Sequence, residues 1–457
     1  MSVRTPDVAA PQTAPTPAPS AWARRPVLGV VAGAVALIGV LLWAYAVGGA
    51  GPAEASGRST ARLAAVATLA SRVTAVGTVG ALLAAAVLLP ATGGRLSLAA
   101  RRASAAAGAW AAGWAVATGI GAYLSTSVLV GVAPTSLPWT SLQVFLLDTG
   151  AGRSALVVVV LTALLAATAG RCTTSAAARV LLAGGLLALV VPVVLSGHST
   201  SADDHLVAVT TLAVHVTAAT LWIGGLLALL VHGRAEPARA AARFSGLALI
   251  CFLATAVTGV LAAGILLGGT GEVLAALGTG YGWLLLAKTA GLVVLGLLGW
   301  QHRRRTLPEL RAGRPGSFRR FAAVELLVML ATVAVAVALA ASPPPAAGAA
   351  GPGSSASPAA AVGPSADPMA GHDHGELSVG VLVDEERFHV AAPVAAGSRV
   401  SVFNGTDQQV TITAEDGSFD VVVPGGSLLT FQAPADPGEY GFTSRHSPEF
   451  TDVLLVK

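Results

Sequence analysis

The sequence predicts an all-α polytopic membrane bundle of about nine transmembrane helices, followed by a small all-β sandwich at the C-terminus. Three observations lead to this fold class. Apolar residues make up 54% of the 457 residues and charged residues only 11%, a balance far from that of soluble domains. Nine apolar runs are long enough to cross a bilayer. Beyond residue 374 the pattern changes to short, β-branched segments separated by turn residues.

The helical part follows a polar N-terminus. Residues 1–25 are rich in Pro, Ala and Thr, and they are predicted to form a disordered cytoplasmic segment. The first apolar run is longer than that of a usual signal peptide, so we expect a retained helix; the alternative is cleavage near Ala44–Ala46. The transmembrane domain is expected to extend from 26 to 341, with spans at 26–48, 64–89, 105–124, 154–170, 179–195, 206–230, 244–267, 282–300 and 321–341.

Arginine is concentrated in alternate loops. Arg24 and Arg25, and the loops around 95–102, 171, 234–243 and 301–320, would all lie on one side of the membrane. Because short cytoplasmic loops carry the excess of Lys and Arg, we expect a multi-pass protein with its N-terminus in the cytoplasm. The excess of Arg over Lys, together with the many Ala and Gly residues, suggests a high-GC bacterial coding sequence. These loop arginines account for the basic charge, so no nucleic-acid partner is expected.

The C-terminal region divides into a linker and a domain. Residues 342–374 are rich in Pro, Ala, Gly and Ser, which is typical of a flexible linker. Residues 375–457 contain short alternating segments bounded by Gly, Asp, Asn and Pro, so they predict a β-sandwich. Since the ninth span ends on the side opposite to the arginine-rich loops, this domain is expected to be extracytoplasmic.

Three histidines lie in one stretch before and within the sixth span. His198 and His205 belong to its polar start, and His215 follows about ten residues later, or about 15 Å along a helix. That position is near the middle of a hydrocarbon core about 30 Å thick, where ionisable side chains are costly and tend to mark pathways. The alternative for His215 is a hydrogen-bonded core histidine. One helix face should carry Thr211, His215, Ala218, Trp222 and Gly225.

These residues carry a resemblance to a known family. The elements that match are Gly197-His198, His215, Trp222-Ile223-Gly224-Gly225, Tyr281-Gly282 and Lys288. Their order resembles the membrane domain of the copper resistance protein D (CopD) family over residues 60–341. The resemblance implies handling of copper at a bacterial plasma membrane, usually as uptake from the outer side. The residues that it implicates are His198, His205, His215 and Trp222, with Lys288 in a supporting role.

The chemistry of the stretch agrees with a copper ion, either Cu(I) or Cu(II), as the bound or transported species, because imidazole is a good ligand for both. Asp203 and Asp204 would attract cations to the outer mouth, although a solvated turn is the alternative. Trp222 is also explained by packing, and Lys288 by an ammonium that reaches the outer interface. Glu325 is expected to form an interfacial ion pair with Arg319 or Arg320.

The C-terminal domain resembles cupredoxins without their metal ligands. Gly438–Phe442 matches the start of the cupredoxin metal loop, but Ser444, Ser447 and Phe450 stand where that family has Cys, His and Met. A cupredoxin-like Greek-key sandwich is therefore expected, without a blue-copper centre. A second group of donors lies in the linker and could collect copper: Met369, His372 and His374.

The sequence thus predicts a protein that is not an enzyme and that imports copper or confers copper resistance through the helix bundle. The expected partners are the lipid bilayer, copper ions and a periplasmic or extracellular copper-binding protein, with no organic cofactor. One alternative is a non-transporting scaffold for copper delivery or metalloprotein assembly. Another is a haem electron-transfer protein, which fits less well because a bis-His haem requires two facing histidines at one depth.

Overall fold

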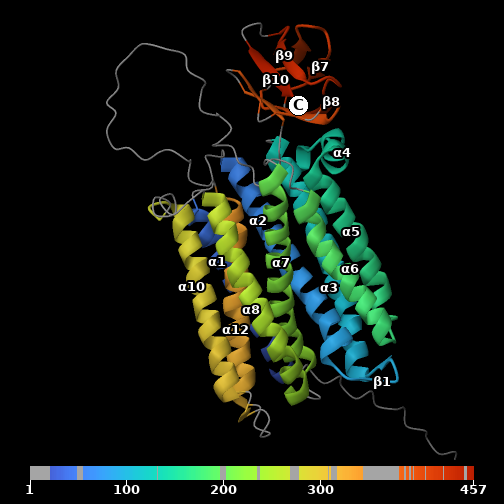
Figure 1. Cartoon of the computed structure of the whole chain (residues 1–457), viewed down its shortest axis with the longest axis vertical. Helices are drawn as coiled ribbons and strands as arrows, with labels where there is room; N and C mark the ends of the chain where they lie inside the picture. The colour runs from blue at the N-terminus through green and yellow to red at the C-terminus, as the bar shows by residue number, and fades with distance from the viewer. Residues whose placement is uncertain are drawn as a thin grey trace, which may run out of the picture.

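The computed structural model describes most of the bundle and most of the β-sandwich. The described residues are 21–48, 55–130, 132–195, 202–233, 237–267, 277–306, 308–309, 316–342, 380–384, 387–390, 393–394, 396–406, 408–425, 427–446 and 450–457. Within these ranges, nine helices are long and apolar enough to cross a membrane, which confirms the predicted bundle (Figure 1).

The long helices follow the predicted spans and extend most of them. They are α1 (Ala21–Val47), α2 (Ala55–Leu83), α3 (Leu98–Val130), α5 (Gly150–Ala169), α6 (Ser175–Leu195), α7 (Ala202–His232), α8 (Pro237–Leu267), α10 (Gly280–Gln301) and α12 (Gly316–Ala340). Short π-helical turns continue α2 and α10, namely η1 (Ala84–Leu88) and η3 (His302–Thr306).

Glycines allow α7 to approach α2 closely. A Cβ atom at Gly80 would lie 2.1 Å from the Gly224 carbonyl oxygen, and one at Gly224 would lie 2.6 Å from the Val76 oxygen. Small residues at such crossings let the two backbones pack directly, which is a common way to hold helices together in a membrane. The contact places α7 inside the bundle, where α8 and α12 pack against its other sides.

Hydrogen bonds and close contacts identify two ends of the bundle. At one end, β1 (Ala91–Thr92) pairs with β2 (Arg95–Leu96), and the backbone of Arg95 forms an isolated β-bridge with that of Thr174. At the same end, the Arg243 guanidinium donates to the Val87 carbonyl oxygen at 3.0 Å. At the opposite end α1 meets α10 and the residues after α12, because a Cβ at Gly280 would lie 2.0 Å from the Val47 oxygen and one at Gly48 would lie 2.0 Å from the Ser342 hydroxyl oxygen. The arginine-rich connections therefore gather at one end, and the β domain lies beyond the other (Figure 1).

Two elements at the β-domain end of the bundle were not predicted from the sequence. A turn η2 (Pro134–Ser136) and a ten-residue helix α4 (Trp139–Asp148) follow α3 at the β-domain end. The sequence did not reveal α4 because it is too short to span a bilayer and lies between two spans. Its Phe145 is buried against the end of α3, while Trp139 is exposed.

The β domain consists of two four-stranded sheets, as predicted for a sandwich. Its strands are β3 (Val381–Val383), β4 (Phe388–Val390), β5 (Arg399–Asn404), β6 (Val410–Ala414), β7 (Asp420–Val423), β8 (Leu428–Gln432), β9 (Gly438–Thr443) and β10 (Thr451–Val456). The sheet orders are β10-β9-β6-β7 and β4-β3-β5-β8, with one parallel pair, β3 and β5. Phe388 and Phe442 are buried in the core between the two sheets, with their ring centroids 5.0 Å apart.

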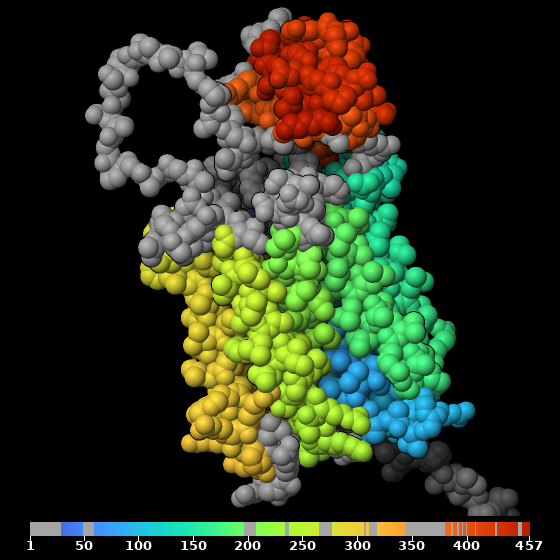
Figure 2. Space-filling model, in the orientation of Figure 1, coloured from blue at the N-terminus to red at the C-terminus, as the bar shows by residue number. Residues whose placement is uncertain are grey.

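The β domain contacts the bundle through β8. Buried Leu428 packs with Leu129, Val130 and Phe145 at the ends of α3 and α4, and Phe403 of β5 lies beside this cluster. Figure 2 shows the domain, in red and orange, seated over that end of the bundle. The contact explains why α4 forms at this place, since its apolar face is covered by α3 on one side and by β8 on the other.

Candidate functional site

The predicted outer donors can be placed only in part. His198, Met369, His372 and His374 lie outside the described residues. Asp203, Asp204 and His205 belong to the first turn of α7, but their side chains are not among those described. The candidate site is therefore built on the residues deeper in the bundle.

The predicted face of α7 is the face that the bundle covers. Thr211 is only 8% exposed and Trp222 only 5%, and Ala218 and Gly225 are buried as well. His215 lies between them and is half-buried. The helical spacing in the sequence thus identified the inward-facing side of α7, because residues three and four apart share one side of a helix.

His215 binds to α8 through a hydroxyl group. Its Nδ1 atom lies 3.0 Å from the Thr258 hydroxyl oxygen, and a Cβ at Gly259 would lie 3.6 Å from the ring. The imidazole therefore packs against Gly259 of α8, at a distance where an added Cβ would make ordinary van der Waals contact. Since α7 and α8 pack along their length, the ring is held at a fixed depth in the bundle.

The hydrogen bonds around Thr258 assign the protons of the His215 ring. The Thr258 hydroxyl donates to the Ala254 carbonyl at 2.6 Å, so its oxygen accepts from the ring. The Thr255 carbonyl lies beside the same hydroxyl, at 3.3 Å, and is a further acceptor for the imidazole. Nδ1 then carries the proton, and Nε2 keeps the lone pair that a metal ion would use. Fixing a ligand histidine through its other ring nitrogen is the usual arrangement at metal sites.

Two more polar groups belong to this region. Lys288 of α10 is half-buried and is close enough to His215 for an electrostatic interaction between the two side chains. The Thr255 hydroxyl oxygen is buried and has no hydrogen-bond partner within the described part of the chain. A buried polar atom of this kind usually marks a place for a water molecule or an ion. The described residues contain no group of three or more His, Cys, Asp or Glu side chains that would form a resident metal site.

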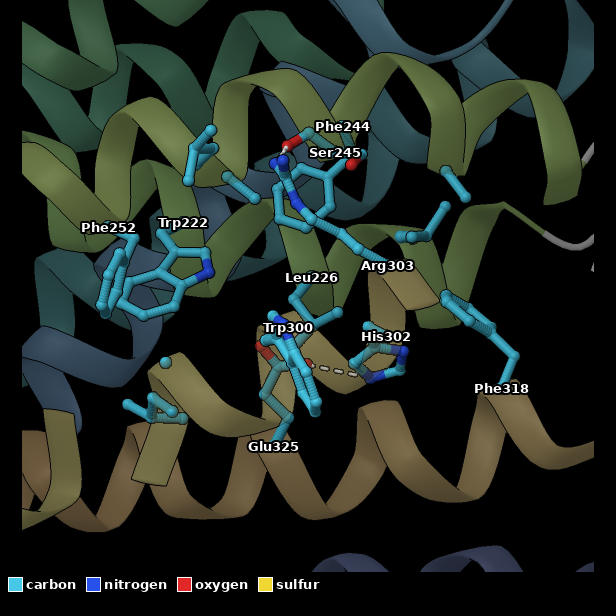
Figure 3. Close-up of a pocket in the computed structure, with 17 residues that line it drawn as sticks. Trp222, Leu226, Phe244, Ser245, Phe252, Trp300, His302, Arg303, Phe318 and Glu325 are labelled. Carbon is cyan, nitrogen blue, oxygen red and sulfur yellow. Dashed lines mark hydrogen bonds and ion pairs between the residues drawn. The ribbon is translucent and has the colours of Figure 1, made fainter. Parts of the chain in front are cut away.

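Trp222 separates this region from a pocket of about 330 Å³ at the arginine-rich end. Its indole contacts Phe252 edge to face, with ring centroids 5.5 Å apart. The two rings lie at one end of the pocket and Phe318 at the other (Figure 3). The walls are mainly apolar and come from α7, α8, α10 and α12. Packing against Phe252 accounts for Trp222 in this position, and packing is one of the two explanations that the sequence offers for this residue.

The pocket contains an ion pair that the sequence did not predict. Nε2 of His302 lies 3.0 Å from a carboxylate oxygen of Glu325, and both side chains are at most 10% exposed (Figure 3). The expected pairing of Glu325 with Arg319 or Arg320 is therefore wrong. The reason is helix geometry, because Glu325 is on the side of α12 that faces α10 and the exposed Arg319 and Arg320 are not. In the sequence, the signal for this pair was the carboxylate of Glu325 inside an apolar run.

In the β domain, residues at the positions that match the cupredoxin metal loop make structural contacts. The Ser444 hydroxyl is buried and accepts from the backbone N–H groups of Thr411 and His446, at 3.4 and 3.3 Å. Phe450 belongs to the core, and Ser447 lies outside the described residues. His389, the buried histidine of β4, pairs with Asp384 at 2.5 Å. Ser444 and Phe450 thus have structural roles in this domain.

Comparison with family models gives a match within the helix bundle. Residues 238–339 match the family described as copper resistance protein D (CopD). This segment contains α8, α10 and α12, and hence Thr258, Lys288 and the His302–Glu325 pair, whereas His215 on α7 lies before it. The match supports the predicted CopD-like membrane domain over this part of the chain. No curated protein and no solved structure matches the chain, and the likeness of the β domain to cupredoxins stays a prediction.

Proposed function

We propose that the protein imports copper across a bacterial plasma membrane, with His215 as a transient ligand near the middle of the helix bundle, and that it catalyses no reaction on the ion. The observation that carries the proposal is the orientation of His215 by Thr258, a residue of the segment that matches the copper resistance family. Copper is the cargo, as Cu(I) or Cu(II), and imidazole suits both.

The surroundings of His215 fit a passing ion better than a stored one. A single imidazole with a neighbouring hydroxyl offers few ligands, and the positive charge of Lys288 opposes tight binding of a cation. Conduction requires binding that is weak enough for the ion to leave. Donors before α7, in its first turn and in the linker would supply copper from the extracytoplasmic side, with Asp203 and Asp204 attracting cations. These donors are His198, His205, Met369, His372 and His374.

Copper flux into proteoliposomes that contain only this protein tests the proposal. We expect copper to accumulate faster than in empty vesicles, because a continuous protein path replaces an apolar barrier that charged ions cross at high cost. Accumulation is measured by a copper-sensitive dye in the vesicle lumen. If these vesicles take up copper no faster than empty ones, the protein is a scaffold that delivers copper to another membrane protein, and the transport proposal fails.

The proposed direction requires the arginine-rich end to be cytoplasmic. A reporter enzyme that is active only in the cytoplasm should work when inserted at 310–315, in the connection between α10 and α12, and should be inactive when fused after Lys457. The reason is the excess of arginines in that connection. Activity at Lys457 together with inactivity at 310–315 would place the β domain in the cytoplasm and reverse the proposed route.

A further inference from the structure

The pocket at the arginine-rich end opens sideways out of the bundle. Two of its lining residues, Leu249 of α8 and Trp300 of α10, are also 42% and 55% exposed on the outside. The two helices meet at Phe252 and Gly296, where a Cβ on Gly296 would lie 3.0 Å from the Phe252 ring. Nearer the end of the bundle, residues of both helices line the pocket, and Leu249 and Trp300 among them are exposed. In a membrane these exposed side chains face lipid, so a lipid chain can enter the pocket beside them without crossing water.

The mouth of the pocket is positively charged. Arg303 lines the pocket, and its guanidinium donates to the Ser245 carbonyl oxygen of α8 at 2.5 Å. The neighbouring Arg304 guanidinium lies 4.3 Å from the centre of the Trp300 ring. Both arginines are exposed, and η3 presents them in the last turn of a membrane span. A headgroup at the membrane surface would therefore meet two guanidinium groups beside the opening.

The interior, in contrast, is mainly apolar. The carboxyl group of Glu325 is paired with His302, and most of the other lining residues are aromatic or aliphatic. A charged headgroup would therefore stay at the mouth, whereas a hydrocarbon chain suits the interior. The volume of about 330 Å³ is at the lower end of the range for small-ligand pockets, about 300–1,000 Å³.

From this geometry we infer that the pocket holds one acyl chain of an anionic phospholipid, whose phosphate binds Arg303 and Arg304. Lipid tails are as apolar as the pocket walls, so burying the chain provides little preference by itself. Selectivity has to come from the headgroup, because the two arginines attract anionic lipids. The site is thus predicted to distinguish anionic from zwitterionic lipids of identical chains. The inference is independent of copper as the cargo.

Substitutions at two glycines separate a specific site from general lipid contact. A Cβ at Gly299 has no atom within 4 Å, and this residue lines the pocket, so Gly299→Leu would fill it without a local clash. Gly246 of α8 is equally open but exposed and outside the lining, which makes Gly246→Leu the matched control. Arg303→Gln with Arg304→Gln removes the charge while leaving the pocket intact, and Arg101→Gln, an exposed arginine of α3, is its control.

Native mass spectrometry of the full-length protein, titrated with phosphatidylglycerol or with phosphatidylcholine of the same chains, tests the inference. We expect one tightly bound phosphatidylglycerol molecule per protein, and an affinity for phosphatidylcholine that is at least about tenfold weaker. Gly299→Leu should abolish this binding, and the double arginine variant should weaken it about fivefold per arginine, whereas both controls bind normally. Equal binding of the two lipids, or normal binding by Gly299→Leu or by the arginine variant, would overturn the site. Oleate that displaces the phospholipid at equal concentration would show that a free fatty acid is the ligand, which also contradicts the inference.

Discussion

Replacing His215 by Ala is expected to abolish copper flux into proteoliposomes while leaving the protein folded and inserted. The substitution removes the imidazole that lies deepest on the described face of α7, and Ala is favourable in a helix. Without Nε2 the ion loses its nitrogen ligand in the middle of an apolar layer, where an unligated charge is most costly. Flux measured at equal protein content, together with size-exclusion profiles of the variants, gives the result.

The matched control is His232→Ala. His232 is a half-buried histidine of the same helix, in its last turn at the arginine-rich end. The His232→Ala variant should transport copper at nearly the rate of the unchanged protein. His302 is unsuitable as a control because it pairs with Glu325. Equal flux through the His215 and His232 variants would show that His215 is a structural histidine.

Thr258→Val tests the same site through the ring orientation. The variant keeps the shape of the residue but loses the oxygen that accepts from Nδ1 of His215. Loss of such a supporting hydrogen bond usually lowers metal affinity or activity about 10–100-fold. We expect a partial loss of flux in Thr258→Val, smaller than the loss in His215→Ala. Unchanged flux in Thr258→Val would show that this hydrogen bond does not support the His215 site.

The second large effect is expected at the His302–Glu325 pair. His302→Ala leaves the Glu325 carboxylate buried among apolar side chains without this partner, and breaking a buried pair in this way costs about 3–5 kcal/mol of stability. The edge-to-face contact between the His302 and Phe318 rings, whose centroids are 5.4 Å apart, is lost as well. The expected result is a clearly lower unfolding temperature in detergent than for the unchanged protein and for His232→Ala.

A double-mutant cycle separates the ion pair from simple loss of packing. His302→Leu combined with Glu325→Leu replaces both partners by apolar side chains, and such replacements of buried pairs are often neutral. The double variant should therefore be more stable than either single variant. If the two single losses add instead, the pair contributes nothing beyond the packing of its two side chains.

The sequence by itself determined the number of membrane spans and the class of the C-terminal domain. Apolar runs of sufficient length predicted the nine spans that the described part of the chain contains, since a bilayer requires about 20 consecutive apolar residues and leaves few other choices. The helical period also identified the covered face of α7, from Thr211 to Gly225, and alternation predicted the C-terminal sandwich. These features depend on neighbours along the chain, and so local patterns reveal them.

Only the tertiary structure decided which residues meet. The Thr258 hydroxyl that orients His215 is 43 residues away, and the partner of Glu325 belongs to another helix. The pocket between α8 and α10 likewise depends on how two helices pack beside α7 and α12. In a membrane every helix satisfies its own backbone hydrogen bonds, so the sequence pattern of each helix carries little information about its neighbours. Packing of small side chains and a few polar contacts fixes the arrangement, and these become visible only when the helices are assembled.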